Sequence, residues 1–160
     1  MGSKMLRIGK LTDYATVILA SMAMDRSRLQ NAGALAERTH IALPTVSKLL
    51  KQLQRSGLVN STRGTHGGYQ LARAPEEISA AAILDALEGP LALTDCSGGH
   101  GRCGIERTCR VGHAWQHLNL AIRRALNDVS LAQLAGIDAM PPMTASTLPL
   151  QSRASLAPRP

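Results

Sequence analysis

The sequence has few aromatic residues and no long apolar run. Aromatics make up 2% of its 160 residues, with no Phe, although hydrophobic residues make up 44%. The core must therefore be built from Leu, Ile, Val and Ala, which favours packed helices over a strand-rich sandwich. No apolar stretch approaches the roughly 20 residues that cross a bilayer, and the N-terminus lacks the apolar block of a secretory signal. We therefore expect a cytoplasmic protein with no membrane partner.

Cysteine is also scarce, and its number is odd. Three thiols in a reducing compartment cannot form a fully paired disulfide framework, so we expect a metal, a cluster or a reactive thiol. The length fits one ordinary domain with appendages rather than two large domains. Met5 follows Gly2-Ser3-Lys4, which is typical of a cloning remnant, so residues 1–4 are left out of the fold prediction.

Acidic residues are outnumbered and are missing from one segment. There are 18 Lys and Arg against 11 Asp and Glu, a formal net charge of +7, which suggests an anionic partner. No acid occurs between Ile41 and Pro75. The basic residues of that segment are Lys48, Lys51, Arg55, Arg63 and Arg73. This concentration is typical of a nucleic-acid footprint, and a basic surface without a partner is the alternative.

Apolar residues at helical spacing predict three helices in the first part of the chain. The first runs from Leu11 to about Asp25, the second over about 32–39, and the third from Pro44 to just before Gly57. The third helix has an apolar face that packs inward and a polar, basic face that points outward. The polar face carries Thr45, Lys48, Lys51, Gln52 and Arg55.

A β-hairpin is predicted after the third helix. The β-prone runs 58–63 and 69–72 flank a glycine-rich turn at 64–68. Two short helices joined by a tight turn and followed by such a hairpin are typical of a winged helix-turn-helix. We therefore expect a mainly α fold with a small β-hairpin wing, in which residues 5–90 form the DNA-binding domain.

The third helix and the hairpin tip are the candidate DNA contacts. A helix fits the roughly 12 Å wide major groove, so its N-terminal side chains are expected to read bases and later ones to bind phosphates. Arg63 stands at the edge of the turn, where an arginine can enter a narrow minor groove. The turn glycines allow a close approach to the duplex or simply form the turn. The full contact set is Thr45, Ser47, Lys48, Lys51, Arg55, Arg63, Thr65 and His66.

The second half of the chain contains two further helices and a loop. Ser79 is expected to cap a fourth helix that closes at Gly89-Pro90, and a cysteine-bearing loop follows over 91–112. Residues 113–138 are predicted to contain one long helix whose apolar seam can pair with a second copy. This seam consists of Trp115, Leu118, Ile122, Ala125 and Val129. Residues 139–160 are rich in Pro, Ser, Thr and Ala without periodicity, which predicts a disordered tail.

The cysteines of the loop, Cys96, Cys103 and Cys109, form a C-x6-C-x5-C pattern among glycines. Thiolates are the usual ligands of iron-sulfur clusters, but three cysteines and a histidine also make a structural zinc set, and unliganded or redox-active thiols are a third possibility. His113, four residues after the last cysteine, is the first candidate for a fourth ligand. His100 and His117 are weaker candidates, and Asp13 from a partner subunit is the alternative. A metal-dependent enzyme is disfavoured because no catalytic constellation accompanies the thiols.

Four stretches of the chain resemble the Rrf2 family of bacterial transcription regulators, in its IscR/NsrR-like branch. They are Leu11-Thr12-Asp13-Tyr14-Ala15, Arg55-Ser56-Gly57-Leu58-Val59, Arg63-Gly64-Thr65-His66-Gly67-Gly68-Tyr69 and the three-cysteine loop. The likeness covers about 5–134 and is greatest to regulators of the SUF iron-sulfur assembly system. It implies a homodimer that binds palindromic operator DNA, carries an iron-sulfur cluster in each subunit and represses cluster-assembly genes.

The resemblance also implies the cluster ligands. Cys96, Cys103 and Cys109 would be ligands, with His113 as the fourth or Asp13 supplied in trans. The first cysteine interval is x6 where better-known relatives have x5, and the histidine lies one position later than in IscR-like proteins. A 2Fe-2S centre is favoured and 4Fe-4S stays open. A repressor that senses nitric oxide or redox state, and a zinc-stabilised DNA-binding protein without a sensory role, are the alternative functions.

Overall fold

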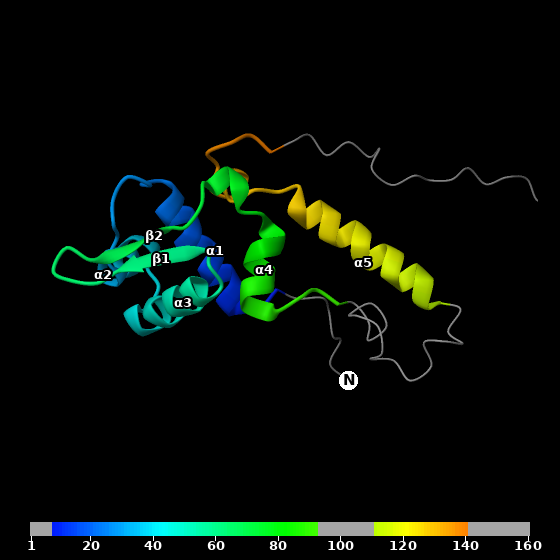
Figure 1. Cartoon of the computed structure of the whole chain (residues 1–160), viewed down its shortest axis with the longest axis horizontal. Helices are drawn as coiled ribbons and strands as arrows, with labels where there is room; N and C mark the ends of the chain where they lie inside the picture. The colour runs from blue at the N-terminus through cyan, green and yellow to red at the C-terminus, as the bar shows by residue number, and fades with distance from the viewer. Residues whose placement is uncertain (1–7, 93–110, 141–160) are drawn as a thin grey trace, which may run out of the picture.

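The computed structural model describes residues 8–92 and 111–140, and helices predominate in it (Figure 1). The elements in chain order are α1 (Lys10–Ala23), α2 (Ala32–Thr39), α3 (Leu43–Arg55), β1 (Val59–Thr62), β2 (Gly68–Leu71), the 3-10 helix η1 (Pro75–Glu77), α4 (Ala80–Glu88), α5 (Gly112–Asn127) and α6 (Leu131–Leu134). The expected mainly α fold with a two-stranded wing is confirmed.

Local sequence signals set most of the helix boundaries. Asn31 caps α2 by accepting a hydrogen bond from the Ala34 amide, and Ser79 caps α4 through the Ala82 amide, as expected for that serine. Pro44 lies in the first turn of α3, where its missing N–H costs no helical bond. His40 ends α2 in the left-handed conformation, with a φ of 54°, so the chain turns into α3 within residues 40–42.

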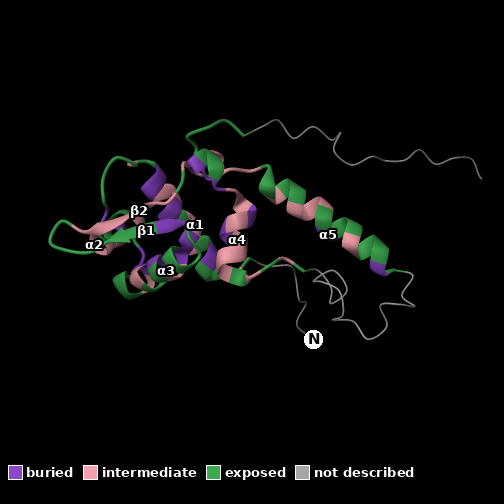
Figure 2. Cartoon of the chain, in the orientation of Figure 1, coloured by how far each residue is buried: buried purple, intermediate pink, exposed green. Residues whose placement is uncertain are grey.

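One hydrophobic core holds α1, α2 and α3 together with the start of the wing. α3 places a buried stripe against α1 and α2, as its apolar spacing predicts. The core side chains include Ile18, Leu19, Met22, Leu35, Val46, Leu49, Leu50, Leu53, Leu58, Ile78, Ile83 and Leu131. Figure 2 shows this burial on the inner faces of α1 and α3, whereas the outer face of α3 is exposed. The core thus holds α3 with its polar face toward solvent.

The wing is a two-stranded antiparallel sheet in which Val59 pairs with Leu71 and Thr62 with Gly68. Val59 is buried, whereas the rest of β1 is exposed. The loop that joins the strands projects from the body of the molecule beside α2 and α3 (Figure 1). The wing is therefore anchored at its base and presents its tip to solvent.

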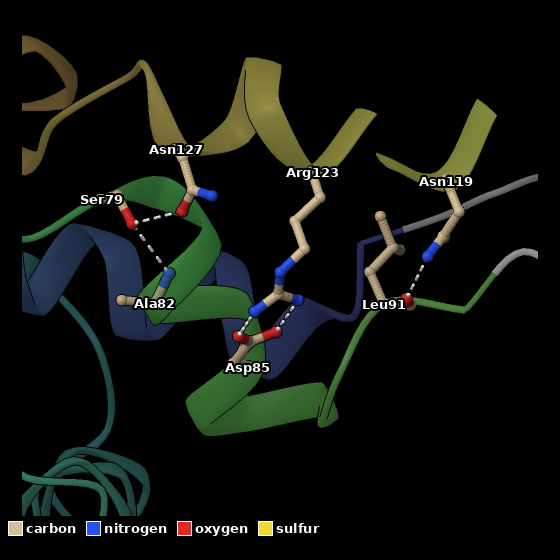
Figure 3. Close-up of polar contacts among 7 residues, drawn as sticks. All are labelled: Ser79, Ala82, Asp85, Leu91, Asn119, Arg123 and Asn127. Carbon is tan, nitrogen blue, oxygen red and sulfur yellow. Dashed lines mark hydrogen bonds and ion pairs between the residues drawn. The ribbon is translucent and has the colours of Figure 1, made fainter. Parts of the chain in front are cut away.

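α5 lies beside α4, and its polar side chains, one helical turn apart, bond to α4 and to residues that flank it (Figure 3). Arg123 donates to both oxygens of Asp85, at 3.1 and 2.5 Å. This hydrogen bonding and the charge of Asp85 raise the pKa of Arg123 above its ordinary value. The Asn119 amide donates to the Leu91 carbonyl at 3.1 Å, and the Ser79 hydroxyl donates to Asn127 at 3.3 Å. These contacts hold α5 against α4 and the residues that flank it.

The expectation of one long helix that includes Val129 is wrong. α5 ends at Asn127, and a short helix, α6, begins at Leu131. A capping box between Ser130 and Gln133 starts α6, whose Leu131 is fully buried in the core. The Val129 carbonyl instead accepts a hydrogen bond from the first amide of α4. Neither α6 nor η1 was expected, and the first helix ends two residues earlier than predicted.

Across residues 8–92 and 111–140, no helix is long and apolar enough to span a bilayer.

Candidate nucleic-acid interface

The exposed face of α3 is the first part of the candidate interface. Lys48, Lys51 and Arg55 are exposed along it, and Thr45 and Ser47 are half-buried near its N-terminal end. A hollow runs along this face and is lined by Pro44, Ser47, Lys48, Lys51, Gln52 and Arg55. The structure therefore brings together the α3 residues that the sequence singled out, on one accessible surface.

Among residues 8–92 and 111–140, no acidic side chain forms an ion pair with the basic residues of this surface. Arg63 and Arg73 are exposed like the three basic residues of α3. Within the described part of the chain, the ion pairs are Arg26 with Glu76 and Arg123 with Asp85, and neither involves the acid-free segment. An unpaired, solvated cation loses little when it meets a phosphate, because no internal partner has to be displaced.

Gln52 differs from its neighbours on α3. Its side-chain amide donates toward the Ala86 and Leu87 carbonyls near the end of α4, at 3.2 and 3.4 Å. The side chain therefore ties α3 to α4, although the helical pattern placed it on the polar face. Because its amide is hydrogen-bonded to α4, Gln52 supports the position of α3 in the interface.

The wing supplies the second part of the interface. Arg63 follows β1 directly and is exposed, as are Thr65 and His66 in the connecting loop. A second hollow lies between α3 and the wing, and its lining residues are Lys51, Gln54, Ser61, Thr62, Arg63, Gly68 and Tyr69. α3 and the wing thus form one continuous surface rather than two separate ones.

Two of the wing glycines are explained by close contacts within the protein. A Cβ atom at Gly67 would overlap the Thr62 carbonyl oxygen, so the hairpin turn itself excludes a side chain there. A Cβ atom at Gly68 would lie 3.0 to 3.2 Å from the backbone of Gln30, which passes beside β2. Both close approaches lie within the protein, which agrees with the simpler expectation of a hairpin turn.

Sequence reasoning missed three polar residues between α3 and the wing. The Gln54 amide donates to the Ser61 hydroxyl at 2.6 Å, which links the end of α3 to β1, and Thr62 lines the same hollow. Their signal in the sequence is weak, because uncharged polar residues are common on any solvated surface. Only the packing of the hairpin against α3 shows that they face the same hollow as Lys51.

The predicted metal site lies largely outside the described residues. The three cysteines, Cys96, Cys103 and Cys109, lie outside the residues that the structure describes. His113 is described, and its side chain is exposed in the first turn of α5. Asp13 is exposed in the first turn of α1. Among residues 8–92 and 111–140, no three His, Cys, Asp or Glu side chains gather in a way that could hold a metal ion. The ligand assignments therefore stay predictions.

The predicted dimer seam is partly exposed on α5. Trp115 and Leu118 are 41% and 46% exposed, Ala125 is exposed and Ile122 is half-buried. Leu120, which was not predicted, is 54% exposed on the same helix. Large apolar side chains in water have a favourable free energy of burial, so this helix can gain stability from a covering partner.

Comparisons with known proteins show that the chain is similar to transcriptional regulators. The family described as "Rrf2: Iron-dependent Transcriptional regulator" matches residues 8–136. The chain is similar to the HTH-type transcriptional regulator IscR of Erwinia tasmaniensis, with 36% identity over 100 residues, which are 62% of this chain and 60% of that protein. The match spans 60–66% of the length of this and similar curated relatives.

Solved structures share the fold. CymR (YrzC), the global cysteine regulator of B. subtilis, has 25% identity and a TM-score of 0.64, covering 84% of this chain and 99% of CymR. IscR of T. potens has 25% identity and a TM-score of 0.62, covering 85% of this chain and 90% of that one. The similar proteins are regulators rather than enzymes, in agreement with the sequence-based expectation.

Proposed function

The chain belongs to the Rrf2 family of transcriptional regulators, and on this basis we propose that it is an iron-sulfur-dependent repressor that binds palindromic operator DNA as a homodimer. The observation that carries the DNA-binding part is the exposed basic surface formed by α3 and the wing. In this proposal residues 5–90 bind DNA, 91–112 bind the cluster and 113–138 contain the dimerisation helix. Its targets are iron-sulfur assembly genes.

Each part of the surface has a proposed role. Side chains near the N-terminal end of α3 read base edges in the major groove, and those further along bind phosphates. Arg63 enters the minor groove, with Thr65 and His66 beside it on the wing tip. The base-reading residues are Thr45, Ser47 and Lys48, and the phosphate-binding residues are Lys51 and Arg55. The exposure of all eight side chains, complete or partial, supports these roles.

The dimer is proposed to form through α5. The exposed apolar side chains of that helix need a partner, and a second copy of α5 offers the same residues in a two-fold arrangement. Two-fold symmetry would present two copies of α3 to the two halves of a palindromic operator. The contacts of Arg123 and Asn127 with α4 support this arrangement, because they keep α5 at a fixed orientation to α3.

The donor set of the cysteine segment fits an iron-sulfur cluster. Three thiolates and an exposed imidazole at the start of α5 are ligand types that such clusters take, and the same set also fits zinc. Cys96, Cys103 and Cys109 would hold the group, with His113 or Asp13 as the fourth ligand, and a 2Fe-2S centre is favoured. When bound, the cluster supplies a redox-active centre whose loss or oxidation can report iron or oxidant levels.

The proposed switch acts through the spacing of the recognition helices. The cysteine segment lies between α4 and α5 in the sequence. A cluster bound there would hold the segment against the dimer helix and so stabilise one placement of that helix relative to the two copies of α3. A ligand shifts such an equilibrium only by its differential affinity for the two states. Operator affinity must therefore differ between the metal-free and the cluster-loaded protein.

The test is analysis of anaerobically purified full-length protein for iron, acid-labile sulfide and zinc, followed by titration of apo and loaded forms on one DNA duplex. We expect iron, sulfide and visible absorption bands, and two different affinities. His113→Ala should change the visible spectrum. His117→Ala, at the weaker candidate one helical turn further along, should leave it unchanged. A colourless, zinc-containing protein would support the structural-metal alternative, and superimposed titrations would refute the switch.

A further inference from the structure

Gln30 is a buried polar residue between α1 and α2, outside every predicted site. It is 6% exposed. Burial of an amide side chain is costly unless its hydrogen-bonding groups find partners. The Gln30 amide nitrogen donates to the Met22 carbonyl at 3.3 Å and to the Asp25 carbonyl at 2.7 Å. Its side-chain oxygen accepts a hydrogen bond from Arg38 on the last turn of α2.

The backbone of Gln30 is bonded to the wing at the same time. Its N–H donates to the Tyr69 carbonyl at 2.9 Å, and its carbonyl accepts from the Tyr69 N–H at 2.9 Å. This antiparallel bridge adds a third backbone segment beside β2. Gly68 lies against the Gln30 backbone so closely that a side chain there would need a shift. One residue therefore joins the end of α1, the end of α2 and the wing.

The wing needs such an anchor. Its two strands have four residues each, and an isolated two-stranded hairpin is at best marginally stable in water. The α2 end that Arg38 occupies leads directly into α3, the helix that the wing must be aligned with. A wing that moved independently of α3 would have to be ordered when DNA binds, at a cost in affinity.

We propose that Gln30 is a positioning residue for DNA binding, which sets the placement of the wing relative to α3 so that Arg63 reaches the duplex. The inference rests on the proposed role of Arg63 and adds the residue that supports it. Gln30 itself lies in the interior of the chain and acts through β2. Loss of its side-chain bonds leaves the backbone bridge without its ties to α1 and α2. The buried base of β1 and the Gln54–Ser61 hydrogen bond still hold the wing near α3, but β2 is placed less tightly.

The test is a double-mutant cycle with full-length protein. The probe is a DNA duplex selected by the wild-type chain from a random-sequence pool, with an unselected duplex of equal length as the reference. Gln30→Met keeps the length of the side chain and removes its hydrogen bonds. We expect about tenfold weaker binding to the selected duplex. In an Arg63→Ala background the same change should have almost no further effect, whereas in a Lys51→Ala background the full tenfold loss should persist.

A matched control is Gln133→Met, which removes a glutamine bonded to the backbone of Ser130 and Ala139 in the α6 region. It should leave the affinity for the selected duplex unchanged. If Gln30→Met does not fold, Gln30→Glu enters the same cycle, because it keeps the acceptor for Arg38 and loses the donor to α1. A helical circular-dichroism spectrum like that of the wild type establishes that each variant folds.

The outcomes separate this inference from the proposed function. If Gln30→Met weakens binding tenfold in both the wild-type and the Arg63→Ala backgrounds, the positioning role is overturned. The role of Arg63 then stays intact. An unchanged affinity of Gln30→Met for the selected duplex would do the same. If Arg63→Ala alone binds the selected duplex like the wild type, the wing assignment fails and the positioning role fails with it.

Discussion

Lys51 offers the sharpest test of the DNA-binding surface, because it lies where the two hollows meet. It lines both the hollow along α3 and the hollow between α3 and the wing. Its side chain is exposed and forms no ion pair within the described part of the chain. We expect Lys51→Ala to weaken binding to all DNA sequences by a similar factor, since a phosphate contact carries no base information.

The size of the effect follows from counterion release. Each phosphate contact adds about 0.9 to the slope of log affinity against log salt concentration on B-DNA. One such contact in each subunit of a dimer makes two, so the slope should become shallower by about 1.8. When salt rises from about 50 mM to about 200 mM, the factor by which affinity falls should therefore be roughly ten times smaller for the variant than for the wild type.

The assay is fluorescence anisotropy on a selected and an unselected duplex at several salt concentrations. Lys10→Ala, at the start of α1, removes the same charge outside the proposed interface and is the control. Its slope should match that of the wild type, which distinguishes a local contact from a change in net charge. An unchanged slope for Lys51→Ala, or a loss confined to the selected duplex, would refute the phosphate assignment.

Three further predictions concern stability and the wing. Leu50→Ala removes a fully buried core side chain of α3 and should lower the free energy of unfolding by about 2–5 kcal/mol in urea denaturation, and a smaller change would mean that the core collapses around the site. A double-mutant cycle of Arg123→Ala and Asp85→Ala should show about 1 kcal/mol of coupling, because the pair is bidentate but partly exposed, and additive effects would contradict the contact. Gly67→Ala should weaken operator binding by about 1–3 kcal/mol and also lower the melting temperature, because its Cβ would overlap the Thr62 carbonyl and the hairpin backbone would have to shift. Unchanged operator affinity of that variant would show that the wing tip tolerates the displacement.

Local signals in the sequence were sufficient for the DNA-binding half of the fold. The second helix lies over the predicted residues, the third begins within one residue of Pro44, and Ser79 caps α4 as expected. These boundaries depend on capping residues, glycine, proline and apolar spacing, all of which act over a few neighbouring positions. The candidate contacts of α3 and the wing could be predicted for the same reason, since they are close in the chain.

The same reasoning failed where distant segments compete for a residue. Val129 continues the apolar spacing of α5, yet its backbone bonds to the start of α4, and Leu131 enters the core. Gln52 has the spacing of a groove-facing residue but donates toward α4. Periodicity describes one helix at a time and contains no information about which neighbouring element will take a given polar or apolar side chain.

The amino-acid sequence alone determined the basic, acid-free segment, the helix-turn-helix with its hairpin and the family resemblance. Each of these depends on residues that are close together in the chain. The tertiary structure alone decided that the hairpin packs against α3 to make one surface, and that Gln30 joins that hairpin to α1 and α2. A buried amide finds its partners only when the chain has folded, so its role depends on segments that no local pattern connects.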